Sequence, residues 1–240
     1  MNPKESDQPK ASGMLSVVST PLGNLGDITT RSLELLKTAD LVLCEDTRTT
    51  GMLLKHLGIQ AVLKSYHAHN EHVILDTILG QLQSGAKMVL VSDAGTPGIS
   101  DPGFLLIRHL LQHGIKVDVA PGPSAILPAL LLSGFPCDRF VFEGFLPLKK
   151  GRATRINALK TETRTVILYE SPHRILRTVK DLAETLGSDR QACLARELTK
   201  LHQETIHLPL AELARHCESK PPKGEIVLVL QGASKDKTRD

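Results

Sequence analysis

The chain has 240 residues, 41% of them hydrophobic, which is enough for one large domain or two of ordinary size. Lys and Arg number 29 against 26 Asp and Glu, so bulk charge does not indicate a nucleic-acid-binding protein. Four scattered cysteines argue against a zinc site and fit a reducing compartment. No apolar run approaches the roughly 18–20 residues of a membrane span, and no secretory h-region is present, so we expect a cytoplasmic protein.

The first half of the sequence predicts a mostly parallel sheet. Residues 1–13 are polar and are expected to form a disordered tail. After them, short aliphatic runs alternate with amphipathic segments, which is typical of strands covered by helices. The expected strands are residues 15–19, 40–44, 61–65, 87–92 and 116–120, and the expected helices between them are residues 29–37, 48–57, 71–83 and 103–112.

The second half predicts a mixed sheet. An apolar helix runs from Ser124 to Ser133, and Gly134-Phe135-Pro136 then forms a hinge, so we expect α/β domains at residues 14–136 and 137–233 and a polar tail at 234–240. The expected strands are residues 140–143, 165–169, 191–196, 204–208 and 225–231, and the expected helices are residues 152–159, 174–186 and 210–217. Short connections require antiparallel pairs, and we expect a ligand cleft between the two lobes.

Loops that follow strands are where an open α/β sheet binds its ligand. The loop at residues 92–103 is rich in Gly, Pro and Ser and has no Lys or Arg, which favours a ligand without a polyphosphate. Asp93 can accept hydrogen bonds there from a hydroxyl or ammonium group. The stiff loop at residues 19–27 is equally consistent with an ordinary βα turn.

Further motifs follow other strands. Ser124 is expected to cap the helix after Pro121-Gly122-Pro123. Tyr169–Arg174 and Arg196–Lys200 place charges at strand ends, where structural ion pairs are the alternative interpretation. A basic strip, Lys149, Lys150, Arg152, Arg155, Lys160 and Arg164, is either an RNA-binding surface or a solvated helix face.

Other nucleotide and metal signatures are absent from the sequence. It has no G-x-G-x-x-G, and the segment from Gly80 to Lys87 leads into a strand and not the helix of a P-loop. His67, His69 and His72 lack an acidic partner at ligand spacing, so we expect no metal site. No G-x-S-x-G or Cys-His pairing indicates a nucleophilic hydrolase.

Taken together, six segments resemble the ribosomal RNA small-subunit methyltransferase I family, in order and without large gaps from Met14 to Gly232. They are residues 19–27, 44–51, 91–103, 121–125, 169–174 and 196–200. The resemblance implies a tetrapyrrole-methylase fold, a homodimer, S-adenosylmethionine as methyl donor, and as substrate the 2′-hydroxyl of a cytidine in the decoding region of 16S ribosomal RNA. The implied partner is thus the small ribosomal subunit, with neither DNA nor a membrane.

The resemblance also implies site residues. The donor is expected to contact Pro21, Asp93, Ala94, Gly95, Ile99, Ser124, Ala125, Tyr169, Glu170, Ala195, Leu198 and Gly224. Managing the hydroxyl proton and holding phosphates needs carboxylates and cations. The candidates, as one group, are Glu45, Asp46, Arg48, Glu170, Arg174, Arg196, Glu197 and Lys200.

One departure from the family and two alternative functions follow from the same residues. Many relatives continue past the last strand into a basic helical extension, whereas here few residues follow Gly232, so the basic strip would have to supply phosphate contacts. A methylase of a small tetrapyrrole or corrin precursor would share the fold, but the Glu-Asp-Thr-Arg and Arg-Glu-Leu-Thr-Lys charges disfavour an apolar trough. A catalytically silent RNA-binding protein is the other alternative.

Overall fold

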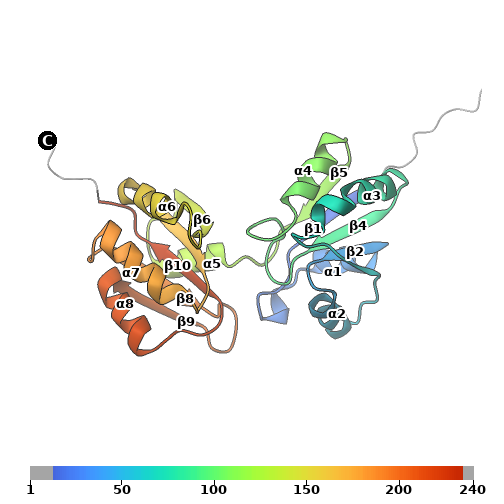
Figure 1. Cartoon of the computed structure of the whole chain (residues 1–240). Coiled ribbons are helices and arrows are strands. Elements are labelled where there is room, and N and C mark those ends of the chain that lie inside the picture. Colours follow the sequence, from blue (N-terminus) through green and yellow to red (C-terminus); the bar gives the residue numbers. More distant parts are fainter. Residues whose placement is uncertain (1–12, 235–240) are drawn as a thin grey trace, which may run out of the picture. The chain divides into compact units, whose positions relative to one another are not determined.

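The computed structural model describes residues 13–234 and divides the chain into two compact units, one ending at Pro123 and the other beginning at Ser124 (Figure 1). The division lies earlier than the boundary expected at Pro136, because the apolar helix that follows Ser124 packs on the second sheet. The expected tails lie outside the described residues except at their inner ends. Gly13 is buried, and its N–H donates to Leu82 O (2.8 Å), so it belongs to the first unit.

The first unit is built on a five-stranded parallel sheet in the order β3-β2-β4-β1-β5. The strands are β1 (Met14–Val18), β2 (Leu41–Cys44), β3 (Leu63–Ser65), β4 (Lys87–Val91) and β5 (Lys116–Ala120). Both faces of the central strands are buried, which explains why β1, β2 and β4 read as continuous aliphatic runs in the sequence. The prediction of a parallel sheet is confirmed.

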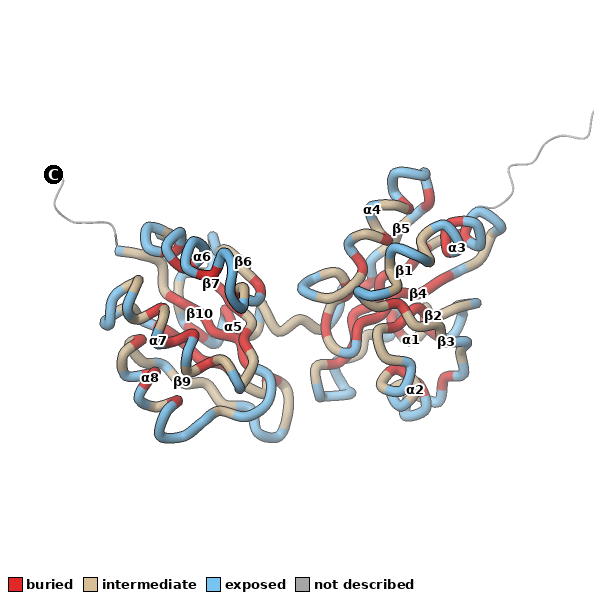
Figure 2. Tube along the Cα trace, viewed as in Figure 1, coloured by how far each residue is buried: buried red, intermediate tan, exposed pale blue. Residues whose placement is uncertain are grey.

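Helices cover both faces of this sheet. Leu15, Leu43, Met88 and Leu90 face α3 (Glu71–Gln83) and α4 (Phe104–Gln112), whereas Val18, Val42, Val89 and Val91 face α1 (Thr30–Lys37) and α2 (Thr47–His56). A short 3-10 turn, η1 (Leu25–Asp27), precedes α1. Figure 2 shows the buried sheet running between these half-exposed helices. The two aliphatic cores fix the sheet, so its loops project from a rigid edge.

The second unit contains a mixed sheet in the order β6-β7-β10-β8-β9. Its strands are β6 (Phe140–Phe145), β7 (Thr165–Glu170), β8 (Gln191–Arg196), β9 (Glu204–Pro209) and β10 (Ile226–Leu230). Only β6 and β7 are parallel, and the other neighbours are antiparallel, as the short connections predicted.

The two faces of the second sheet are covered unequally. Apart from η2 (Leu159–Thr161), the helices are α5 (Ile126–Ser133), which covers one face alone, and α6 (Arg152–Ala158), α7 (Ile175–Leu186) and α8 (Leu210–Ser219), which cover the other. Side chains alternate along β7, so Tyr169 lies on the α5 face and Glu170 on the α7 face. Across residues 13–234, no helix has the length and apolarity needed to cross a membrane.

Candidate active site

Backbone hydrogen bonds join two of the predicted loops at the carboxyl edge of the first sheet. Thr20 N–H donates to Gly95 O and Gly95 N–H donates to Thr20 O, both at 2.9 Å. The Thr20 hydroxyl also donates to Ser92 O (3.0 Å). A third loop is attached by Thr96, whose hydroxyl donates to Pro123 O (3.2 Å). Segments that are far apart in sequence thus form one continuous edge of loops.

Gly95 lies at the centre of this edge in a backbone conformation that only glycine adopts readily. Its φ is 78°, and a methyl group there would lie 3.3 Å from Leu22 Cδ2. Gly95 is itself buried, so its missing side chain allows the close packing of this turn against Leu22. Because residues 92–103 contain no Lys or Arg, this edge suits a nucleoside better than a nucleotide polyphosphate.

Carboxylates of two neighbouring strands border the same edge. Glu45 and Asp46 follow β2, Asp93 follows β4, and Asp46 N–H donates to Asp93 Oδ1 (3.2 Å). Burial, and then the charge of Asp93, raise the pKa of Glu45 above its ordinary value. The excess negative charge is suited to a cationic ligand.

Asp46 has a different environment from Glu45. Its carboxylate caps α2 by accepting from Arg48 N–H (2.8 Å) and pairs with the Arg48 guanidinium (2.6 Å). These bonds lower the pKa of Asp46 to about 2. Asp46 is therefore occupied as a helix cap and as the partner of Arg48, whose side chain is exposed.

His67 was missed as a site residue in the sequence, where it was considered only as a metal ligand. It follows β3, the neighbour of β2, and its charge acts on Glu45 to lower the pKa of that carboxyl. Its Nδ1 is buried without a hydrogen-bond partner. Its position after β3 at the carboxyl edge was the signal that could have found it. Within residues 13–234, no group of three or more His, Cys, Asp and Glu side chains could hold a metal ion.

The donor residues predicted in the first unit lie on this edge. Pro21 follows Thr20, and Asp93, Ala94 and Gly95 form the bridged turn. Ile99 lies farther along the loop, where it lines an apolar hollow of about 600 Å³ together with Phe104, Ile107 and Leu111 of α4. That hollow offers an apolar surface beside the polar edge.

Most donor residues predicted in the second unit share one apolar cluster on the α5 face. These are Ala125, Tyr169, Ala195 and Leu198. Ser124 caps the first turn of α5: its hydroxyl accepts from Ile126 N–H (3.3 Å), and Ala125 between them already has helical backbone angles (φ −76°, ψ −22°). The prediction that Ser124 caps this helix is confirmed.

Gly224 lies apart from that cluster, against Glu197. A methyl group at Gly224, whose φ is 82°, would lie only 2.2 Å from Glu197 Oε1. The glycine is thus required by the fold of this loop. Gly224 can face a ligand only through its backbone.

Glu170 has a structural environment that its place in the motif did not predict. Its side chain is 1% exposed and accepts from the Thr178 hydroxyl (2.5 Å) and Ser171 N–H (2.9 Å). Arg174 Nε lies 3.3 Å from the same carboxylate, and Arg174 Nη2 donates to Leu146 O (2.6 Å). A carboxylate enclosed in this way holds loops together, so the structure argues against Glu170 as the proton acceptor.

The predicted charges after β8 are also bonded within the unit. Arg196 donates to the carbonyl oxygens of Lys223 and His202, both at 2.9 Å. Glu197 accepts from Lys200 Nζ and from Glu225 N–H, both at 3.0 Å. These bonds lower the pKa of Glu197 and hold the loop before β10. The structural alternative considered for this motif describes what these side chains do.

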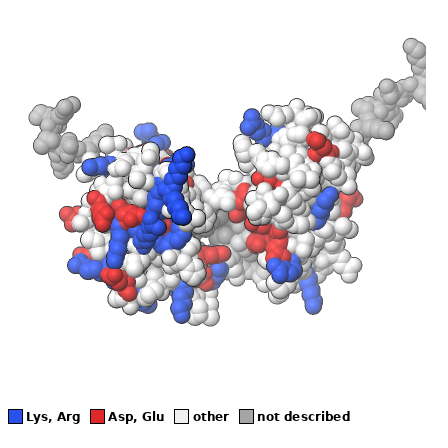
Figure 3. Space-filling view, in the orientation of Figure 1, with Lys and Arg blue, Asp and Glu red and all other residues white. Residues whose placement is uncertain are grey.

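The basic strip is not a single surface. Arg152 is buried and donates to Asp181 and the Thr178 hydroxyl, both at 2.8 Å. Arg155 pairs with Glu143, and Arg164 pairs with Glu162. Figure 3 shows that Lys and Arg on the viewed face of the second unit are interspersed with acidic side chains. The exposed cations of the strip that make no ion pair within residues 13–234 are Lys149, Lys150 and Lys160.

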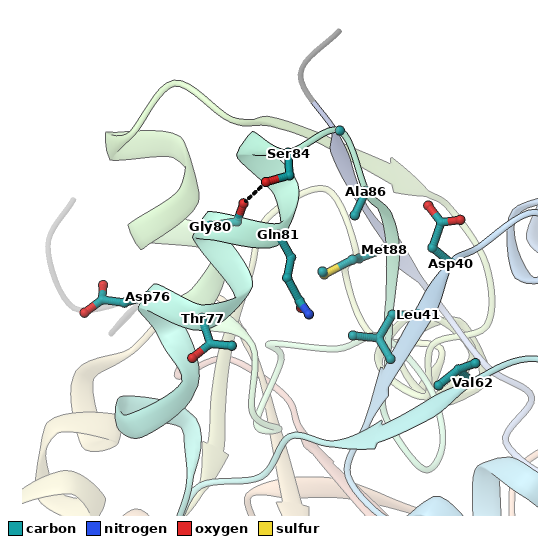
Figure 4. A pocket seen from close by; sticks show the side chains of 11 residues that line it. Asp40, Leu41, Val62, Asp76, Thr77, Gly80, Gln81, Ser84, Ala86 and Met88 are labelled. Atoms are coloured by element: carbon teal, nitrogen blue, oxygen red, sulfur yellow. Dashed lines mark hydrogen bonds between the residues drawn. The ribbon is translucent and has the colours of Figure 1, made fainter. Parts of the chain in front are cut away.

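A hollow of about 810 Å³ in the first unit lies away from the candidate site. Its lining comes from α3 and from residues at the starts of β2 and β4, including Asp40 and Ala86 (Figure 4). Ser84 Oγ donates to Gly80 O (2.9 Å) at its rim, and Gln81 extends toward the sheet. Because strand starts line it, this hollow is at the edge opposite the donor loops.

Comparison with known proteins identifies the fold. A crystal structure of uroporphyrin-III C-methyltransferase from Thermus thermophilus, complexed with S-adenosylhomocysteine, superposes with a TM-score of 0.64 at 20% identity and covers 92% of this chain and 97% of that chain. The family model of tetrapyrrole (corrin/porphyrin) methylases matches residues 14–214. The fold is thus that of a tetrapyrrole methylase, as predicted.

Curated relatives narrow the assignment. Ribosomal RNA small subunit methyltransferase I of Escherichia coli O157:H7 is 50% identical over 224 residues, which cover 92% of this chain and 78% of that protein. The protein of the same name from Thermotoga maritima is 47% identical over 220 residues, which cover 92% of this chain and 99% of that protein. The chain therefore belongs to the ribosomal RNA small subunit methyltransferase I family, and the resemblance stated above is confirmed.

Proposed function

We propose that the chain transfers a methyl group from S-adenosylmethionine to the ribose 2′-hydroxyl of a cytidine in 16S ribosomal RNA of the small subunit. The observation that carries this proposal is the edge of the first sheet, where the cation-free turn at Gly95 adjoins Glu45 and Asp93. The names of the curated relatives supply the RNA class.

The residues of this edge fit the proposed donor. S-adenosylmethionine supplies a methyl group on a positively charged sulfur. Asp93 can accept hydrogen bonds from ribose hydroxyls or an ammonium group, and together with Glu45 it offsets positive charge.

Glu45 is the residue we propose as the proton acceptor. A ribose hydroxyl is a weak nucleophile, so a base must take its proton as the new oxygen–carbon bond forms. A carboxyl whose pKa is raised is a stronger base than an ordinary carboxylate, and burial beside Asp93 raises the pKa of Glu45. His67 acts on Glu45 from the neighbouring strand and can stabilise its ionised form.

We propose that Lys149 and Lys150 contact RNA phosphates. They follow β6, whose last residue pairs with Tyr169, so they lie at the end of the second sheet that carries the predicted site residues. Arg174 and Arg152 hold this loop by donating to Leu146 O (2.6 Å) and Pro147 O (3.3 Å). The fixed backbone keeps two exposed ammonium groups near the place where RNA would bind.

The proposal includes a homodimer that works in the cytoplasm, where ribosomal subunits are found. Leu127, Leu131 and Leu132 of α5 form an exposed apolar face, which a second copy of the chain could cover. Sedimentation should give twice the chain mass, and Leu131→Asp should lower it to a monomer. Sedimentation of the unaltered chain as a monomer at micromolar concentration would contradict the dimer.

Methyl transfer to unmodified small subunits tests the function. The purified protein is incubated with labelled S-adenosylmethionine and small subunits that lack the modification, and the label is mapped by nuclease digestion. We expect the label on one cytidine 2′-oxygen, and its loss in Asp93→Asn. Donor binding without transfer to RNA would favour the small-molecule methylase, and failure to bind the donor would favour the silent RNA-binding protein.

A further inference from the structure

We propose that Phe145, supported by Tyr169, is a stacking platform for an unpaired base of the RNA substrate. The proposal rests on the proposed function and deepens it, because it assigns a contact to the base of the substrate and not to its backbone. None of the contacts proposed above is to a base of the RNA. Phe145 and Tyr169 are opposite one another on β6 and β7.

A β-bulge places Phe145 on the site face. The register between β6 and β7 shifts between Phe142 and Gly144, which has a φ of 63°. In a regular strand, residues three apart point to opposite faces, so Phe142 and Phe145 would be separated by the sheet. The extra residue returns both rings to the face of Tyr169. Bulges of this kind often re-aim side chains next to active sites.

The three aromatic rings, Phe142, Tyr169 and Phe145, differ in how far they are exposed to solvent. The Tyr169 ring lies 5.0 Å from the Phe142 ring and 5.6 Å from the Phe145 ring, measured between centroids. Phe142 and Tyr169 pack against the cluster beneath α5, whereas Phe145 is 51% exposed. The chain has no Trp and only five Phe, so an aromatic ring fixed at the surface by a bulge is an unusual use of its few aromatic residues.

The surroundings of Phe145 match single-stranded RNA. Leu148, 64% exposed, extends the apolar surface, and Lys149 and Lys150 follow immediately. A flat apolar ring bordered by ammonium groups complements a base joined to its phosphates. Stacking requires an unpaired base, so the occupant is a single-stranded or flipped nucleotide and not a duplex. A purely apolar protein partner would leave both lysines without a counter-charge.

A tryptophan introduced on β6 can report stacking directly, because the chain contains no other tryptophan. Phe145→Trp keeps a stacking ring, and we expect its fluorescence to be quenched by a short cytidine-containing single-stranded RNA, but not by the same RNA in a duplex. The matched control is Phe140→Trp, at the other end of the same strand and 36% exposed. Equal quenching of both tryptophans, or no quenching at Phe145→Trp, would overturn the proposal.

Affinity and salt dependence separate base from phosphate contacts. We expect Phe145→Ala to weaken single-stranded RNA binding about 5- to 150-fold without changing the slope of log affinity against log salt. Lys149→Glu with Lys150→Glu should reduce that slope by about 0.7 for each lost phosphate contact. Phe140→Ala should change neither quantity. Unchanged RNA affinity in Phe145→Ala would reject the platform.

Two further measurements separate this proposal from the donor site and from the proposed function. Phe145→Ala should bind S-adenosylhomocysteine as the unaltered chain does, and a loss there would assign Phe145 to the donor instead. If the unaltered chain methylates small subunits while Phe145→Ala does so with an unchanged KM, the platform is wrong and the function stands. If the unaltered chain does not methylate RNA, the proposed function fails, and the quenching experiment still decides whether Phe145 stacks.

Discussion

The two sheets differ at the ends that carry the predicted site residues. In the first unit, backbone bonds between Thr20 and Gly95 join the loops, and Asp93 remains exposed beside them. In the second unit, Glu170, Glu197 and Arg196 are all bonded within the unit. A charged residue at a strand end is therefore a candidate for catalysis or ligand binding only where its side chain has few hydrogen-bond partners within the fold.

Sheet topology explains the difference. In a parallel sheet every strand delivers its following loop to the same edge, so Glu45 and Asp93 are brought together there. In the mixed sheet, the ends of β7 and β8 meet the start of β10, since Ile226 pairs with both Glu170 and Arg196. Loops that follow one strand and precede its antiparallel neighbour lie at the same edge of the sheet, where their side chains and backbone groups form hydrogen bonds with each other.

The largest effect expected is on stability, at Arg152. Arg152→Met removes a buried guanidinium that bonds Asp181 and Thr178, and Thr178 in turn bonds Glu170. We expect the free energy of unfolding to fall by about 3–5 kcal/mol, because two hydrogen bonds of a buried charged group are lost, each contributing about 1.5–3 kcal/mol. Urea unfolding measures it.

The matched control for Arg152 is Arg155→Met on the same helix. Arg155 is largely exposed and pairs with Glu143 at 3.1 Å, so its loss should cost about 0–1 kcal/mol. Equal losses in the two variants would show that the buried network does not stabilise the second unit, and would weaken the contrast between the two edges.

The next largest effect is on donor binding at Asp93. Asp93→Asn keeps an oxygen that can accept from Asp46 N–H but loses the charge. We expect S-adenosylmethionine affinity to fall about 10- to 100-fold, which corresponds to about 1.5–3 kcal/mol for a hydrogen bond to a charged group. Titration calorimetry measures it. Glu204→Gln, in the second unit, removes a carboxylate bonded to Arg196 and Lys220 and should leave donor affinity unchanged.

Much of the fold could be predicted from the sequence, because aliphatic runs and their punctuating loops have strong signals. The domain boundary could not: α5 is apolar almost all round, so no polar face indicated which sheet it covers. The bulge at Gly144 was not predicted either, although a glycine inside a strand pattern is a signal of one.

The candidate site was predicted best where backbone conformation matters. The glycine-rich turn was recognisable from composition, whereas the partners of charged side chains were not. The environment of Glu170 could have been inferred from alternation along β7, because Val166 and Leu168 on the same face are core residues. The burial of Arg152 depended on Asp181 and Thr178, which are distant in sequence and became neighbours only through packing of α6 on α7.

A smaller effect is expected from adding a methyl group to the donor turn. Gly95→Ala forces a left-handed backbone on alanine and brings Cβ to 3.3 Å from Leu22. The free energy of unfolding should therefore fall by about 1–2 kcal/mol. Donor affinity should fall as well, because the turn must shift to relieve the contact with Leu22, and Asp93 and Ala94 would move with it. Gly80→Ala in α3 meets nothing within 4 Å and should instead stabilise by up to about 1 kcal/mol. Equal donor affinities in both variants would remove Gly95 from the site.

The smallest effect expected is a difference in pH dependence between Glu45 and Asp46. Because the folded state raises the pKa of Glu45, its favourable contribution is present at low pH and is lost as pH rises through the folded pKa. The contribution of Asp46 to stability depends on pH in the opposite direction. Its pKa is lowered to about 2, so its contribution is present above the unfolded pKa and is lost as pH falls toward about 2. Relative to the unaltered chain, Glu45→Gln should therefore gain stability between about pH 4 and 7, whereas Asp46→Asn should be least stable there. Urea unfolding across that range measures both variants, and matching pH profiles would mean that Glu45 is not distinguished from its neighbour and is not poised to accept a proton.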